Sequence, residues 1–111
     1  MTATLRPNRA VRMLNGTPTG VGLDAFCDSC NRYLEAGDDV RVYVTAGRGD
    51  RLSLRWVSCS TCGPCGDATA AEDGELHAVA TLRSVLNAPS PRLVLTDARL
   101  DPDVSHEVVR R

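Results

Sequence analysis

The chain has 111 residues, of which 42% are apolar and 24% charged, and this size suits one domain rather than two. The chain contains thirteen basic and fourteen acidic residues, a formal charge of -1. This charge excludes the strongly basic surface of a general nucleic-acid coat. No apolar run reaches the roughly 18 to 20 residues that cross a bilayer, and no secretory signal pattern is present, so we expect a cytoplasmic protein that does not bind membranes.

The first segment, residues 1–23, is basic and rich in residues that favour turns. It contains three arginines and no acid, together with several glycines and prolines, while the remainder of the chain carries a formal charge of -4. This composition predicts a flexible basic arm rather than a packed element. The arm could contact an acidic partner, although a solvated terminus is the simpler interpretation.

Residues 40–57 carry the pattern of a β-hairpin. Valines at 40, 42 and 44 alternate with polar side chains, which is typical of a half-buried strand, and a second alternating run comes after a turn at 46–50. All four aromatic residues fall between positions 26 and 56, so we expect the large buried side chains to gather in this middle part of the chain, around its cysteines. The side chains expected on the interior face with the valines are Leu52, Leu54 and Trp56.

The C-terminal half is expected to add a second β-hairpin. Residues 75–86 fit both a strand and one face of a helix. The strand is favoured because a turn at 87–91 leads into another alternating run at 92–100, with which it can pair. A short polar tail ends the chain.

Two Cys-x2-Cys pairs flank the central hairpin and indicate a metal site. Cys27 and Cys30 precede the hairpin, Cys59 and Cys62 come after it, and 28 residues separate the pairs. A tight turn places both sulfurs of a pair on one side, and antiparallel strands bring the two pairs together. Four thiolates can then close a tetrahedron around Zn²⁺, the cofactor that we expect.

The residues around the second pair leave one alternative open. Cys65 comes after Cys62 at the same spacing, so it could replace Cys62 as a metal ligand. The pair of Cys59 and Cys62 is the preferred ligand pair, because Cys59 directly ends the strand. Asn31 and Gly63, one after each pair, tolerate the left-handed backbone angles that point N–H groups at sulfurs. Without a metal, the cysteines would be free thiols or, in a secreted protein, two disulfides.

The string Cys62-Gly-Pro-Cys65 also looks like the redox motif of thioredoxin. In that family the motif ends a buried strand and begins a long helix, whereas here Gly66 comes next and β-hairpins flank the string. A thiol-disulfide oxidoreductase using Cys62 and Cys65 is therefore the third hypothesis for function.

Other side chains give no pattern of catalysis. His77 and His106 do not lie at ligand spacing from a cysteine pair, and we find no phosphate loop and no nucleophile elbow, so we expect no enzyme. Arginines with an interleaved aromatic can contact phosphate and stack on bases, and the alternative is ordinary decoration of a solvated sheet. The candidate contacts to nucleic acid or another partner are Arg41, Tyr43, Arg48, Arg51 and Arg55.

Three segments together carry a resemblance to a known group of proteins. They are Cys27-Asp-Ser-Cys30, Glu35-Ala-Gly-Asp-Asp-Val-Arg-Val-Tyr43 and Trp56-Val-Ser-Cys59-Ser-Thr-Cys62-Gly63. Over residues 24–66 the chain resembles small archaeal zinc-ribbon or zinc-finger proteins of halophile type, whose function is uncharacterised. The resemblance implies a metal-binding adaptor that assists transcription, translation or protein contacts.

The predicted fold class is mainly β, a zinc-ribbon-like hairpin with two cysteine knuckles plus a C-terminal β-hairpin, with few or no long helices. We expect a flexible arm at 1–23, a zinc-binding hairpin module at 24–66, and a hairpin and tail at 67–111 that pack on the module as one domain. The predicted function is a non-enzymatic structural zinc module that contacts a protein partner, and the main alternative is a nucleic-acid-binding regulator of transcription or translation.

Overall fold

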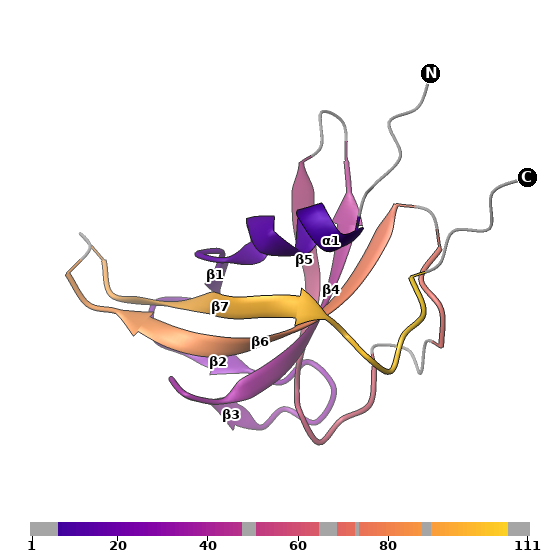
Figure 1. The fold of residues 1–111 in the computed structure, drawn as a ribbon. Coiled ribbons are helices and arrows are strands. Elements are labelled where there is room, and N and C mark those ends of the chain that lie inside the picture. The colour runs from indigo at the N-terminus through magenta and orange to yellow at the C-terminus, as the bar shows by residue number, and fades with distance from the viewer. Residues whose placement is uncertain (1–6, 48–50, 65–68, 73, 88–89, 107–111) are drawn as a thin grey trace, which may run out of the picture.

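The computed structural model describes residues 7–47, 51–64, 69–72, 74–87 and 90–106. They form a five-stranded antiparallel sheet in the order β1-β7-β6-β4-β5 and a separate two-stranded sheet, β2-β3 (Figure 1). The elements are α1 (Pro7–Ala10), the 3₁₀ turn η1 (Val11–Leu14), β1 (Pro18–Thr19), β2 (Ala25–Phe26), β3 (Tyr33–Leu34), β4 (Asp39–Ala46), β5 (Leu52–Cys59), β6 (Glu75–Val85) and β7 (Arg92–Leu100). Within these residues the fold is mainly β and has no long helix, which confirms the predicted fold class.

Strands β4 and β5 form the predicted central hairpin. The three valines of β4 are buried while Arg41, Tyr43 and Thr45 are half-buried on the opposite face, as the alternation predicts. The core beneath the valines is aliphatic and is continuous with the inner faces of β6 and β7.

The prediction that Trp56 faces the interior is wrong, because β5 contains an irregularity. Tyr43 pairs with Trp56 whereas Val44 pairs with Leu54, so Arg55 is an extra residue in the ladder. Leu54 therefore stays on the valine face, but Trp56 moves to the face of Tyr43. Strict alternation cannot reveal such a bulge, since one extra residue reverses the side of every side chain beyond it.

The aromatic residues do not form the core that their clustering in the sequence led us to expect. Phe26, Tyr33 and Trp56 are 51%, 44% and 37% exposed, and Tyr43 is half-buried. The fully buried large side chains are instead leucines and valines. This distribution leaves three of the four aromatic rings largely at the surface.

The ambiguous segment, predicted at residues 75–86, forms a strand, β6 (Glu75–Val85). Leu76, Ala78, Ala80 and Leu82 are all buried on one face, so the period is two and the helical interpretation is wrong. β6 pairs with β4 on one side and with β7 on the other, which makes one continuous sheet of the two hairpins (Figure 1).

The described part of the N-terminal segment differs from a loosely draped arm. Helix α1 and the turn η1 lie across β7 (Figure 1), and Ala10, Val11 and Leu14 are buried in the common core. Strand β1 then pairs with β7 and covers its outer edge. Short apolar stretches of this kind fold only because a partner surface exists, so composition alone does not predict them.

The segment after β7, residues 101–106, is tied to the outer face of the sheet. The guanidinium of Arg41 makes two hydrogen bonds to the buried carboxylate of Asp101, at 2.7 and 2.8 Å, and a third to Asp103 at 2.8 Å. The backbone N–H of His77 donates to Nε2 of His106, and burial lowers the pKa of both imidazoles. Both histidines thus take part in holding this segment.

None of the helices in the described residues has the length and apolar character needed to span a membrane.

We predict that Gly20 is required at the turn that leads into β2. Its φ of +65° disfavours side chains, and a Cβ there would overlap the carbonyl oxygen of Asp24, so Gly20→Ala should lower the free energy of unfolding by about 2 to 4 kcal/mol. Gly16, with φ of +88° and nothing within 4 Å, is the matched control, and Gly16→Ala should cost only about 1 kcal/mol. Urea unfolding measures both, and equal losses would contradict the role of the steric overlap.

Candidate metal centre

The four cysteines of the two pairs come from two segments that are far apart in the sequence. Cys27 directly follows β2, and Cys30 lies in the loop between β2 and β3. Cys59 is the last residue of β5, and Cys62 lies in the turn after it. We call the two-stranded sheet β2-β3 and the loop that joins its strands the knuckle lobe (residues 25–34). The loop of the knuckle lobe faces the end of β5.

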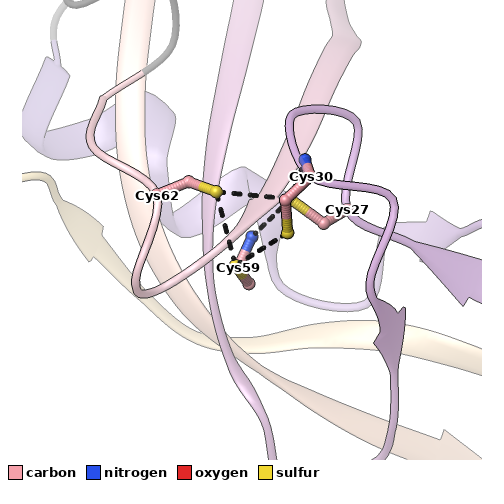
Figure 2. Close-up of side chains that lie close together, drawn as sticks. All are labelled: Cys27, Cys30, Cys59 and Cys62. Atoms are coloured by element: carbon pink, nitrogen blue, oxygen red, sulfur yellow. Dashed lines mark hydrogen bonds between the residues drawn. The ribbon is translucent and has the colours of Figure 1, made fainter.

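The four sulfurs converge on one point (Figure 2). They all lie within 4.8 Å of one another, with Cys27 to Cys62 at 3.8 Å, Cys30 to Cys59 at 3.6 Å and Cys59 to Cys62 at 3.5 Å. A tetrahedral ion with metal–sulfur bonds of about 2.3 Å requires sulfurs about 3.8 Å apart. The described residues therefore place four sulfur donors in an arrangement that suits a metal ion.

The same distances are too long for disulfide bonds. A disulfide brings two sulfurs to about 2.05 Å, and Cys27, Cys30, Cys59 and Cys62 are all free thiols in this structure. Cys65, the predicted substitute ligand, lies outside the described residues. Cys62 does belong to the cluster, in keeping with the preferred pairing.

Backbone N–H groups point at the sulfur of Cys27. The N–H of Cys30 donates to it at 3.3 Å and the N–H of Cys59 at 3.2 Å, so one sulfur is contacted from both segments. Asn31 adopts the predicted left-handed conformation, with φ of +65°, and its N–H donates to the carbonyl of Cys27. Gly63 does not have a positive φ, so that prediction is wrong and the second turn closes without one.

The knuckle lobe is also hydrogen bonded to the edge strand β5. The N–H of Asp28 donates to the carbonyl of Val57 at 2.8 Å, and the N–H of Val57 donates back to the carboxylate of Asp28 at 2.7 Å. The indole N–H of Trp56 donates to the hydroxyl of Ser29 at 3.2 Å. These bonds fix the first cysteine pair against the strand that carries Cys59.

The thiols differ in how readily they ionise. The hydroxyl of Thr61, 3.1 Å from Sγ of Cys59, lowers the pKa of Cys59 to about 6, whereas the neighbouring thiol of Cys59 raises the pKa of Cys62 to about 12. Burial opposes ionisation of Cys27, but the N–H groups of Cys30 and Cys59 outweigh it and lower its pKa. Four adjacent thiolates repel one another, and a divalent cation would relieve that repulsion.

The pKa of Cys30 is raised. The N–H of Arg32 is the largest single influence and favours the thiolate, but the neighbouring sulfurs of Cys27 and Cys59 together with burial outweigh it. The pKa values of Cys27 and Cys59 are thus lowered and those of Cys30 and Cys62 are raised, because ionisation of one thiol opposes that of its neighbours.

Sequence reasoning did not identify Asp28 and Thr61 as parts of this site. Each lies between the two cysteines of a pair, where a short polar side chain can bond to the backbone or to a sulfur. Their position inside a Cys-x2-Cys turn was the available signal.

Of the predicted basic contact surface, one cation is neutralised by an ion pair in the described residues. Arg41 is paired with Asp101 and Asp103, and the hydroxyl of Tyr43 donates to the carboxylate of Glu75. Arg55 donates to the hydroxyl of Thr45, and Arg51 is exposed beside the tip of the hairpin. Arg48 lies outside the described residues.

Neither histidine belongs to the cysteine cluster.

A small polar pocket opens beside Cys59. It encloses about 40 Å³ and is lined by Arg32, Leu34, Asp38, Asp39, Cys59 and Ser60. A space of this size holds about one water molecule.

Comparisons with family models, with curated proteins and with solved structures found no match to this chain.

We predict that Thr61→Val weakens metal binding by about tenfold while leaving the fold intact, because valine keeps the shape of threonine but cannot donate to the sulfur of Cys59. Competition with a chromophoric zinc chelator measures the affinity. Ser60→Ala removes the neighbouring hydroxyl, which lies on an exposed residue, and should leave the affinity unchanged. Equal effects of the two substitutions would show that the hydroxyl of Thr61 does not support the ligand.

Proposed function

We propose that this chain is a non-enzymatic module in which one structural Zn²⁺, held by Cys27, Cys30, Cys59 and Cys62, fixes a surface that contacts another protein. The observation that carries the proposal is the convergence of four sulfurs from two chain segments within 4.8 Å. Four thiolates with no open position are the donor set of structural zinc sites, and soft sulfur ligands disfavour magnesium and calcium.

The knuckle lobe supports a structural role because it has little other means of folding. Its strands are two residues long, and its buried side chains other than Cys27 are Ala25 and Leu34. An isolated hairpin of this kind is marginal in water. A zinc ion joining the lobe to β5 would supply the missing free energy, since metal binding and folding are coupled in such sites.

We also propose that the module acts in the reducing cytoplasm, where cysteines that hold a structural metal do not form disulfides.

Contact with a protein is favoured over contact with nucleic acid. The neutralisation of Arg41 by two carboxylates removes a central member of the candidate phosphate surface. Trp56, Phe26 and Tyr33 instead leave aromatic surface near the cysteine cluster, and aromatic side chains are enriched at protein interfaces.

An oxidoreductase is less well supported. Cys62, which would be one redox thiol, lies 3.5 Å from Cys59 and 3.8 Å from Cys27 in the cluster. The pocket beside Cys59 is far below the roughly 300 to 1,000 Å³ of sites that bind small molecules.

We expect native mass spectrometry with elemental analysis to find one zinc ion per chain. Cys27→Ser should abolish zinc retention and lower the thermal midpoint by more than about 10 °C, because the thiolate that contacts both segments is lost. Cys65→Ser is the matched control and should retain one zinc, since Cys62 occupies the cluster. A wild-type chain that folds without metal, or a Cys65→Ser variant that loses it, would contradict this assignment.

A further inference from the structure

The two-stranded sheet β2-β3 has one buried and one exposed face. Ala25 pairs with Leu34, and both are buried, whereas Phe26 pairs with Tyr33 and both rings point to solvent. The two rings meet edge to face with their centroids 5.5 Å apart. The backbone carbonyl of Leu23 accepts a hydrogen bond from the hydroxyl of Tyr33. We call Phe26 and Tyr33 the aromatic face.

The aromatic face is not required to bury the core. Its rings are about half exposed, while the residues that alternate with them provide the packing against the rest of the chain. Exposed Phe and Tyr on a sheet face offer a large contact area, and each ring has only two side-chain torsions to fix on binding. The chain has only four aromatic residues, and it places two of them here.

The surroundings of the aromatic face are acidic. Asp24 accepts from the hydroxyl of Tyr33, and the charges of both Asp24 and Glu35 act on that hydroxyl. Residues 21–39 contain five acids and one arginine, a formal charge of -4, while the remainder of the chain carries +3. Within the described residues none of these five acids forms a salt bridge. A zinc ion with four thiolates would add a further -2 beside them.

We propose that the aromatic face, with Asp24 and Glu35 at its rim, docks a cationic peptide segment of another protein. Arginine or lysine side chains of that segment stack on the rings of Phe26 and Tyr33, and their charges face the two carboxylates. The inference rests on the proposed function, because the zinc ion is what holds the knuckle lobe in place, and it adds the chemistry of the partner.

The charges beside the aromatic face decide between the classes of partner. Asp24 and Glu35 at its rim repel phosphate backbones, so stacking of nucleic-acid bases on the same rings is disfavoured. A basic protein segment gains from both the rings and the carboxylates.

The test uses the full zinc-loaded chain and a short synthetic peptide in which arginine alternates with glycine, with binding measured by isothermal titration calorimetry. We expect binding that weakens with added salt, and none to the same peptide with glutamate in place of arginine. Phe26→Ala should raise the dissociation constant at least about fivefold. Leu86→Ala removes a 65% exposed side chain outside this face and should leave the dissociation constant unchanged.

A second pair of variants tests the charges. Glu35→Gln should weaken binding about two- to threefold at low salt and reduce the salt dependence, whereas Glu72→Gln, a matched change at an exposed glutamate outside residues 21–39, should not. Equal binding by the Phe26→Ala and Leu86→Ala variants, or no binding of the arginine peptide, would overturn the inference. A wild-type dimer that Phe26→Ala converts to a monomer would also overturn it, since a second copy would then occupy the face.

Zinc is measured in the same samples to separate this inference from the proposed function. Zinc retained by every variant with loss of peptide binding in Phe26→Ala supports both. Zinc retained without any peptide binding overturns only the docking inference. Peptide binding that persists in a chain shown to hold no metal overturns the proposed zinc module and leaves the docking surface standing.

Discussion

The convergence of two cysteine pairs at the open end of the β4-β5 hairpin is the constraint on which the rest of the site depends. The knuckle lobe has two-residue strands and few buried side chains, so its position relative to β5 is set by the four sulfurs and by the bonds between Asp28 and Val57. Crowded thiolates are unfavourable alone and favourable around a cation. A metal ion here would therefore convert a weak hairpin into a rigid platform. A rigid platform would hold the exposed Phe26 and Tyr33 in a fixed position for binding a partner.

The features that the sequence predicts well are those governed by local periodicity and spacing. The alternation of Val40, Val42 and Val44 predicts which face of β4 is buried, and the 28-residue spacer between cysteine pairs is explained by an antiparallel hairpin that returns the chain to its starting point. Asn31 takes the left-handed angle that a tight cysteine turn favours. These relations involve residues close in sequence or a fixed strand geometry, and they need no knowledge of the remaining fold.

The features that escape prediction depend on contacts between distant residues. The extra residue at Arg55 reverses the side of Trp56, and nothing in the alternating pattern marks it. The neutralisation of Arg41 involves carboxylates 60 and 62 positions away, so one cation of a surface that looks basic in sequence is paired in the fold. Leu14 is buried only because β7 provides a surface for the N-terminal turns. The fold neutralises Arg41 but leaves the acids of the knuckle lobe and its flanks without salt bridges among the described residues. This contrast is one support for our proposal that the partner is a basic protein segment.

X-ray absorption spectroscopy at the zinc edge of the purified, metal-loaded chain identifies the atoms bound to the metal. We predict four sulfur neighbours at about 2.3 Å and no nitrogen or oxygen in the first coordination shell. A shell that contains nitrogen or oxygen ligands, or fewer than four sulfurs, would contradict the assignment of Cys27, Cys30, Cys59 and Cys62 as one closed tetrathiolate centre.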